Sequence, residues 1–213
     1  MTELSELSYI ERQTKQAIEI LKKGGIVAYP TDTVYGLGAD PLNKRAVDKI
    51  YRAKKRPHNQ PLPLLLADKS DLSKVASTLP DIVWKLAGRF WPGGLTLVLK
   101  KSAWVPGYLT AGGDSIAVRI PNHAIPITLA RGLGCPIIGT SANISGKPSP
   151  LTAHEVREQL GKEVDLIIDG GRCPGGIDST VLDVSGQVLT IIREGAVPKK
   201  ELAKLGVPLS TKT

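Results

Sequence analysis

The sequence predicts an α/β domain whose sheet mixes parallel and antiparallel strands. Helical and strand patterns alternate along the 213 residues and are separated by short joints, as in folds built from strand–helix–strand units. Two strand patterns near the C-terminus, at 180–184 and 188–192, follow each other without a helix, which indicates an antiparallel pair. No repeat or long linker divides the chain. We therefore expect one domain over residues 1–213, with a core at about 12–198 and less ordered ends.

Each element is predicted from its own pattern. In the first helix, at 10–23, apolar residues recur at a helical period until Gly24 and Gly25 end it. The helices predicted after it are, in chain order, Lys44–Lys54, Asp81–Phe90, 125–131 and 152–160. Short apolar runs bounded by turn residues predict the strands. These runs are 26–30, 64–66, Leu95–Lys100, 116–120, 136–139, 166–169, 180–184 and 188–192.

Composition argues against a membrane or secreted protein and favours one that binds polyanions. No apolar run approaches the roughly 20 residues of a membrane helix, and the charged first 20 residues resemble neither a secretory signal nor a transit peptide. We therefore expect no membrane partner. The chain carries 28 Lys and Arg against 20 Asp and Glu, a net charge of +8. A basic protein attracts polyanions, so nucleotides and nucleic acid are the favoured partners.

Cysteine and histidine usage favours a reducing compartment and no resident metal. The two cysteines, Cys135 and Cys173, occur in unrelated contexts, which is typical of structural thiols in a cytoplasmic protein. Cys173 lies in a Gly- and Pro-rich segment that we expect to be an exposed loop. The three histidines are isolated along the chain, so local spacing predicts no histidine-based metal site.

Residues 29–38 read Tyr-Pro-Thr-Asp-Thr-Val-Tyr-Gly-Leu-Gly and follow the first predicted strand. Hydroxyl and carboxyl groups are clustered there, and the glycines that follow allow a ligand to approach the backbone closely. Polar residues at the end of a strand are where α/β folds bind ligands. Thr and Asp are equally common in capped turns. The pattern alone leaves both interpretations open.

A basic segment follows at 44–56, with seven basic residues and one acid. Arg45, Lys49, Arg52 and Arg56 are spaced to share one face of a helix, which most often is a solvated face. The segment ends in Lys54-Lys-Arg-Pro, where the proline stops the helix. A lysine point charge beside a planar guanidinium suits a polyphosphate, so this end of the helix is a candidate phosphate site.

A third polar segment, Gly-Thr-Ser-Ala-Asn-Ile-Ser-Gly at 139–146, follows another apolar strand. Its hydroxyl and amide groups can contact phosphate oxygens or a hydrated magnesium ion. The spacing of a P-loop is absent, and so is Gly-x-Gly-x-x-Gly. Arg119, Ser179 and Arg193 lie in or beside strand-like stretches, where an arginine requires an ion pair or a bound anion. Strand alternation places Arg119 on the same side as Ala117. No acid is adjacent in 115–121, so we expect Arg119 to point into a cavity without a carboxylate near it.

Five motifs together resemble the YrdC-like L-threonylcarbamoyladenylate synthase family. They are Pro-Thr-Asp-Thr-Val-Tyr-Gly-Leu-Gly at 30–38, Lys-Lys-Arg-Pro at 54–57, Thr-Ser-Ala-Asn-Ile-Ser-Gly at 140–146, Asp-Ser-Thr-Val at 178–181 and Ile-Arg-Glu-Gly at 192–195. The resemblance implies a stand-alone YrdC-like domain, a twisted mixed sheet flanked by helices around a basic cavity. It also implies synthesis of threonylcarbamoyl-AMP and pyrophosphate from L-threonine, bicarbonate or CO2, and ATP. Partner proteins would then transfer the threonylcarbamoyl group to the tRNA adenosine next to the anticodon.

The resemblance also assigns expected roles to individual residues. The expected catalytic residues, which would surround the ATP phosphates, are Lys54, Arg56, Ser141 and Asn143. The side chains of Lys54 and Arg56 are expected to be partly exposed in the cavity. Two further residues match positions on the ATP side, Ser149 and Arg193. The expected threonine-binding residues are Thr33, Arg119, Thr140 and Ser179, with Thr140 placed where either substrate could reach it. Mg²⁺ would be held mainly by ATP and not by the protein.

Two points stay open at this level. Many relatives carry a polar residue in the strand after Lys-x-Arg-Pro, whereas this chain reads Pro-Leu-Pro-Leu-Leu-Leu at 61–66, which puts one threonine contact in question. No general base is obvious, although Asp32 is a candidate. The alternatives to synthesis are an RNA-binding module, with tRNA or double-stranded RNA on the basic face, and a fold relative that acts as an adenylate hydrolase or carbamoyl-transfer domain.

Overall fold

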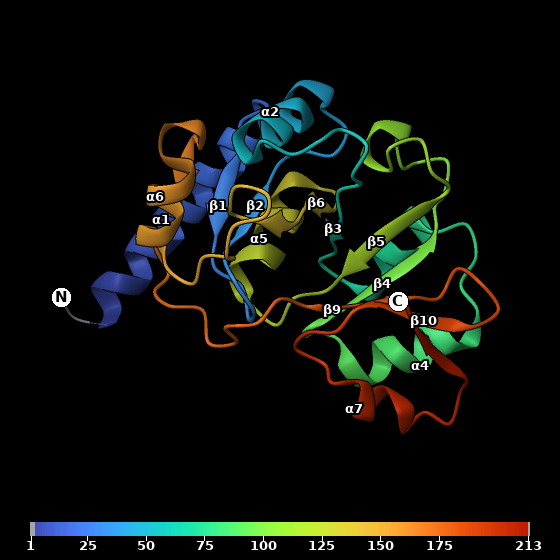
Figure 1. Cartoon of the computed structure of the whole chain (residues 1–213). Helices are drawn as coiled ribbons and strands as arrows, with labels where there is room; N and C mark the ends of the chain where they lie inside the picture. Colours follow the sequence, from blue (N-terminus) through green and yellow to red (C-terminus); the bar gives the residue numbers. More distant parts are fainter. Residues whose placement is uncertain (1–2, 213) are drawn as a thin grey trace.

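The helices of the structure follow the order predicted from the sequence (Figure 1). This computed structural model describes the backbone of residues 3–212 and the side-chain surroundings of residues 9–212. Its helices are α1 (Glu3–Lys22), α2 (Lys44–Lys54), α3 (Leu72–Val75), α4 (Asp81–Phe90), α5 (Ala124–Leu133), α6 (Ala153–Leu160) and α7 (Lys199–Ala203), with short 3-10 helices η1 (Lys69–Asp71), η2 (Gly107–Leu109) and η3 (Gly161–Glu163). All predicted helices are confirmed, and α3 and α7 were not predicted. The expectation about the outermost ends falls partly on residues 1, 2 and 213, which lie outside the described residues.

The strands form two sheets. They are β1 (Val27–Tyr29), β2 (Gly36–Gly38), β3 (Leu64–Leu65), β4 (Leu95–Lys100), β5 (Ser115–Arg119), β6 (Ile137–Ile138), β7 (Thr140–Ser141), β8 (Leu166–Ile167), β9 (Thr180–Asp183), β10 (Leu189–Arg193) and β11 (Leu209–Thr211). The small sheet has the order β7-β2-β1-β8, and the large one β11-β10-β9-β4-β5-β3-β6. Strand β4 runs parallel to β9 and antiparallel to β5, and β9 and β10 pair antiparallel. The mixed pairing is confirmed, but it is divided over two sheets.

Strand β2 was not predicted, because its sequence, Gly-Leu-Gly, looks like a loop. The structure shows why glycine is needed: the ring of Tyr29 on the neighbouring strand β1 lies over both glycines. A Cβ added at Gly36 or Gly38 would come within 2.8 Å or 2.7 Å of that ring. The Tyr29 hydroxyl donates a hydrogen bond to the carbonyl of Ile138, at 3.1 Å. Glycine is therefore required at both positions to leave space for the Tyr29 side chain.

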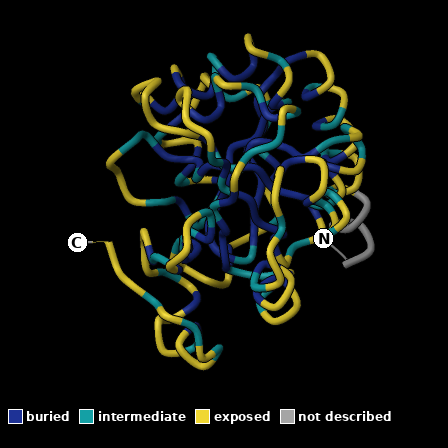
Figure 2. The backbone as a smooth tube through the Cα atoms, turned by 90° about the vertical axis from the view of Figure 1, so that its right-hand side faces the viewer, coloured by how far each residue is buried: buried dark blue, intermediate teal, exposed yellow. Residues whose placement is uncertain are grey.

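Buried residues occupy the middle of the molecule, and exposed segments run along its periphery (Figure 2). One apolar cluster fills the space between α2, α4 and the large sheet, and a second packs α1 and α5 against β1. Helices α4 and α7 lie together beside the C-terminal strands (Figure 1), linked by an ion pair between Arg89 and Glu201. None of the helices described is both long enough and apolar enough to cross a membrane.

Helix α2 leads the chain toward the functional region. Asn43 caps its first turn by accepting hydrogen bonds from the backbone of residues 45 and 46, as an N-cap residue does. Its predicted buried face, which carries Ile50, is confirmed. The helix ends at Lys55, which adopts the left-handed conformation, with φ at 49°. Arg56 therefore leaves the helix and points in a different direction from the basic residues of the helix surface.

Candidate active site

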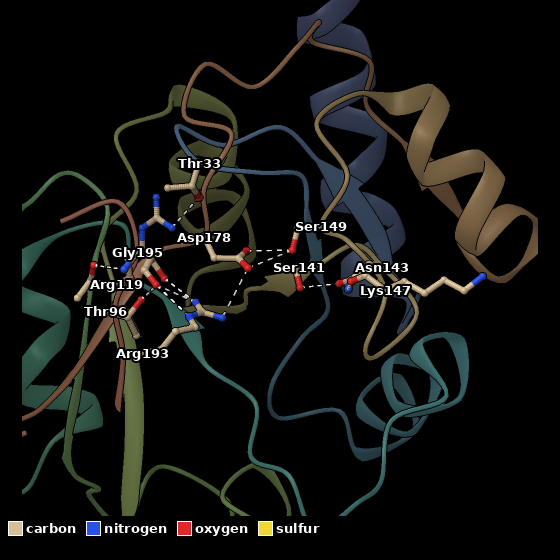
Figure 3. Close-up of polar contacts among 12 residues, drawn as sticks. Thr33, Thr96, Arg119, Ser141, Asn143, Lys147, Ser149, Asp178, Arg193 and Gly195 are labelled. Carbon is tan, nitrogen blue, oxygen red and sulfur yellow. Dashed lines mark hydrogen bonds and ion pairs between the residues drawn. The ribbon is translucent and has the colours of Figure 1, made fainter. Parts of the chain in front are cut away.

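A cavity of about 440 Å³ opens between the two sheets, because its walls come from β2 and β7 on one side and from β4, β5, β9 and β10 on the other. Most of the residues expected to bind substrates line it: Thr33, Arg56, Arg119, Thr140, Ser141, Ser179 and Arg193. The expected residues that do not line it are Lys54, Asn143 and Ser149. Figure 3 shows part of the site, including Thr33, Arg119 and Arg193. Arg56 and Arg119 give the cavity wall positive charge.

The turn after β1 is held in one shape by Thr31. Its hydroxyl donates to the carbonyl of Val34, at 2.7 Å, and accepts from the backbone N–H of Thr33, at 3.0 Å. Gly175 packs against this turn so closely that a Cβ there would lie 2.5 Å from the carbonyl oxygen of Asp32. The polar segment at 29–38 is thus both a structured turn and part of the cavity wall.

Arg119 on β5 points into the cavity, as strand alternation predicts, but it has protein partners. Its Nε donates to the carbonyl of Gly93 at 2.8 Å, its Nη1 to the Thr33 hydroxyl at 2.9 Å, and its Nη2 to the Asp32 carboxylate at 2.5 Å. The expectation that no carboxylate is near Arg119 is therefore wrong. A guanidinium has five N–H groups, so one on each terminal nitrogen remains for a ligand. Asp32 lies behind the arginine and does not line the cavity.

Ser179 is fixed by the strands around it. Its hydroxyl hydrogen-bonds with that of Thr96 on β4, at 2.8 Å. The next residue, Thr180, is fully buried, and its hydroxyl accepts from the backbone of Gly195 at 2.8 Å and donates to the carbonyl of Val197 at 2.6 Å. A Cβ at Gly195 would collide with the carbonyl of Asp178. The motifs at 178–181 and 192–195 therefore pack against each other.

Sequence reasoning did not single out Asp178, which lies at the centre of the site (Figure 3). Its carboxylate accepts from the Ser149 hydroxyl at 3.0 Å and pairs with Arg193 at 3.7 Å. Arg193 also donates to the carbonyl of Ser179, at 2.8 Å. Asp178 is the first residue of the Asp-Ser-Thr-Val motif at 178–181, and its place next to Ser179 was the one signal that could have identified it. Ser149 acts on the cavity through this carboxylate.

Lys54 and Asn143 lie behind the cavity wall. Lys54 is only 1% exposed, so the expectation that its side chain is partly exposed in the cavity is wrong. Its ammonium donates to Ser141 and Asn143, and Ser141 donates its own hydroxyl hydrogen to the Asn143 side chain at 2.6 Å. Ser141 is the member of this group that reaches the cavity.

Arg56 is the basic-segment residue that faces the cavity. Its Nη2 donates to the carbonyl of Pro61 at 3.0 Å, while its Nε is buried without a hydrogen-bond partner. Arg56 lines the cavity wall, where its guanidinium can pair with an anion. The apolar run at 61–66 supplies Leu62 and Leu65 to the same wall, so this strand brings no polar side chain to the cavity.

The two cysteines have no sign of reactivity. Cys173 is buried, so the expectation of an exposed loop cysteine is wrong, and burial raises the pKa of its thiol. Burial also raises the pKa of Cys135, to about 11. Both thiols therefore stay protonated near neutral pH. No group of three or more His, Cys, Asp or Glu side chains with a metal-binding arrangement occurs among the residues the structure describes.

Comparison with known proteins agrees with the geometry. The family model Sua5/YciO/YrdC, described as telomere recombination, matches residues 19–195. A threonylcarbamoyl-AMP synthase of Pyrococcus abyssi is 44% identical over 92% of this chain and 57% of its own length. One of Bacillus subtilis is 41% identical over 96% of this chain and 59% of its own.

A solved structure, that of P. abyssi Sua5 complexed with L-threonine, superposes with a TM-score of 0.90 at 42% identity, over 93% of this chain and 59% of that one. The chain therefore spans somewhat more than half the length of these relatives. The matched residues contain the strands, turns and loops that build the cavity. The chain belongs to the Sua5/YciO/YrdC family.

Proposed function

We propose that this chain synthesises L-threonylcarbamoyl-AMP, releasing pyrophosphate, from L-threonine, bicarbonate and ATP. The observation that carries the proposal is a cavity lined by three arginines from different elements, Arg119 on β5, Arg193 on β10 and Arg56 after α2, together with several hydroxyl groups. This arrangement suits one substrate with a carboxylate and another with a polyphosphate. The relatives named threonylcarbamoyl-AMP synthases support the same reaction.

Threonine is proposed to bind at the Arg119 end. Each terminal nitrogen of Arg119 keeps one N–H for a ligand, and a guanidinium is the cation that suits a carboxylate best. The hydroxyls of Thr33 and Ser179 lie on the same part of the wall and already have fixed partners. Side chains that are already fixed lose little conformational entropy when a ligand arrives. The L-threonine complex of P. abyssi Sua5 supports threonine as a ligand.

The phosphates of ATP are proposed to lie near Arg56, Ser141 and Arg193. The positive charges of Arg56 and Arg193 on the cavity wall support an anion at this place. Threonine and bicarbonate first give the carbamate and water. A carbamate oxygen then attacks the α-phosphorus, its bond to phosphorus forms, and the bond to the bridging oxygen of pyrophosphate breaks. The arginines stabilise the negative charge that collects on the leaving group, so no covalent intermediate with the protein is needed.

Magnesium fits this proposal as an ion carried by ATP. The cavity wall offers two carboxylates, Asp178 and Asp183, and the described residues hold no cluster of three ligating side chains. When bound, Mg²⁺ would neutralise part of the triphosphate charge. Hydroxyl groups such as that of Ser141 would contact its water shell.

The reaction is tested by following pyrophosphate release from purified protein. We expect release to require ATP, L-threonine and bicarbonate together, because the carbamate oxygen is the nucleophile. Pyrophosphate release at the same rate without an amino acid would contradict the proposal. In the variant Arg119→Lys the KM for threonine should rise by about 10- to 100-fold, since a guanidinium suits a carboxylate better than an ammonium does. The KM for ATP should change much less.

The remaining assignments follow from the same proposal. The product would pass to partner proteins that transfer the threonylcarbamoyl group to tRNA, and ATP and tRNA as substrates favour a cytoplasmic location. Direct RNA contact would use the exposed Arg45 and Arg52 of α2, which lie outside the cavity. An adenylate hydrolase would consume the adenylate without making it, and a carbamoyl-transfer domain would use carbamoyl phosphate. Product analysis by mass spectrometry separates these alternatives.

A further inference from the structure

The contacts of Lys54 differ from those of a phosphate ligand. Lys54 is the last residue of α2 and its side chain is among the largest that are fully buried in the molecule. It does not line the cavity, whereas Arg56, two residues further along, does. A lysine that captures a phosphate normally extends a mobile ammonium into the ligand site. Here the ammonium lies behind the wall.

The ammonium group of Lys54 already has a full set of partners. It lies 2.5 Å from the carbonyl oxygen of Ser141, 2.8 Å from the carbonyl oxygen of Asn143 and 3.1 Å from the Asn143 side-chain oxygen. An ammonium has three N–H donors, so these three acceptors leave none for a ligand. All three belong to the segment 141–143, which is 87 to 89 residues away in the chain.

The same segment is tied to Lys54 and to itself by further bonds. The backbone N–H of Ser145 donates to the carbonyl of Lys54, at 2.8 Å. The Asn143 amide donates to the carbonyl of Lys147, at 2.6 Å, which closes the loop on itself. The Ser141 hydroxyl donates to the same Asn143 oxygen that Lys54 contacts. These bonds fix the position of the Ser141 hydroxyl at the cavity and the direction of its lone pairs.

We propose that Lys54 is a positioning residue, which fixes the 141–147 loop through its ammonium group so that Ser141 presents its hydroxyl to the cavity. It touches no substrate. Its consequence for catalysis rests on the proposed function, since Ser141 is placed there beside the ATP phosphates. The clamp itself is a property of the protein without ligands, and this makes it testable on its own.

The first experiment labels lysines of the unmodified protein with acetic anhydride, followed by mass spectrometry. Burial, with Arg56 adding to its effect, lowers the pKa of Lys54 to about 7, so an accessible Lys54 would be among the most reactive lysines. Because it is enclosed, we expect it to react at least about tenfold more slowly than its exposed neighbour Lys55, without any nucleotide. Rapid labelling that only ATP suppresses would overturn the proposal.

The second experiment compares Lys54→Met with Lys55→Met as a matched control one residue away. In ligand-free protein, hydrogen exchange of the backbone amides at 139–147 should accelerate at least about tenfold in Lys54→Met, because the loop loses its clamp. The control should exchange like the wild type. If Lys54 were only a phosphate ligand, ligand-free exchange would be unchanged in both variants, and that result would contradict the proposal.

Kinetics separate a local clamp from a general loss of structure. In Lys54→Met, kcat for pyrophosphate release should fall strongly while the KM for threonine stays within about twofold, since the Arg119 end has its own supports. A large rise in the threonine KM would contradict a local role. If the wild type released no pyrophosphate, the proposed function would fail, while labelling and exchange would still decide the role of Lys54.

Discussion

The cavity contains two arginine–carboxylate pairs that are built differently. Arg119 and Asp32 are 2.5 Å apart, with side chains 8% and 15% exposed. Arg193 and Asp178 are 3.7 Å apart, with side chains 49% and 35% exposed. In the first pair the arginine also bonds to Gly93 and Thr33, so its orientation is fixed before any ligand arrives. The second pair is partly exposed and can adjust to a ligand. Of these two arginines, Arg119 is therefore the rigid cation and Arg193 the adaptable one.

The same substitution at the two carboxylates should give the largest contrast. Asp32→Asn leaves Arg119 as a buried charge without a counter-charge, which costs roughly 3–5 kcal/mol. Asp178→Asn removes an exposed pair and should cost below about 1 kcal/mol. Urea unfolding of both variants measures the difference. Equal losses of stability would show that burial does not distinguish the two pairs.

Lys54, the buried lysine behind the cavity wall, should make the stability of the protein depend on pH. Its pKa in the folded protein is about 7, below the usual value of 10.5. Between these values the unfolded chain binds more protons than the folded one, so stability should rise with pH by up to about 1.4 kcal/mol per unit. The rise should be absent from Lys54→Met. Parallel curves of unfolding free energy against pH for the two proteins would contradict the lowered pKa.

Gly195 packs against the backbone of Asp178 and Ser179 and so helps to hold the Arg193–Asp178 pair in place. Gly195→Ala would push that backbone away, and overpacking of this kind costs typically 1–3 kcal/mol. We expect lower stability together with a higher KM for threonine, since Ser179 would move. Gly186→Ala is the control, because a Cβ there meets nothing within 4 Å. An unchanged KM in Gly195→Ala would separate Ser179 from threonine binding.

The smallest expected effect concerns the adaptable cation itself. Arg193→Lys keeps the charge but removes bonds to the Ser179 carbonyl. Because the side chain is about half exposed, stability should change by less than about 1 kcal/mol. The KM for ATP should rise while that for threonine stays nearly constant. A threonine effect as large as that of Arg119→Lys would remove the distinction between the two ends.

Local patterns in the sequence were sufficient for much of the fold. The helix at Lys44–Lys54 and the strand at Leu95–Lys100 have the predicted bounds, because apolar spacing reports directly which face of an element is buried. The antiparallel pairing of β9 and β10 followed from two strands joined by a short turn. Strand β2 could not be predicted in this way, because its glycines are required by contact with the Tyr29 ring, which belongs to another strand.

The candidate site was predictable in its residue types but not in its contacts. The sequence by itself identified which segments carry hydroxyls and cations and, through alternation along β5, that Arg119 faces the cavity. Only the tertiary structure paired Arg119 with Asp32 and Lys54 with Asn143, partners 87 and 89 residues apart. A periodic pattern records whether a position is buried, but not which distant group satisfies its charge. That choice depends on how the two sheets pack, and it decides which cations are free to meet a substrate.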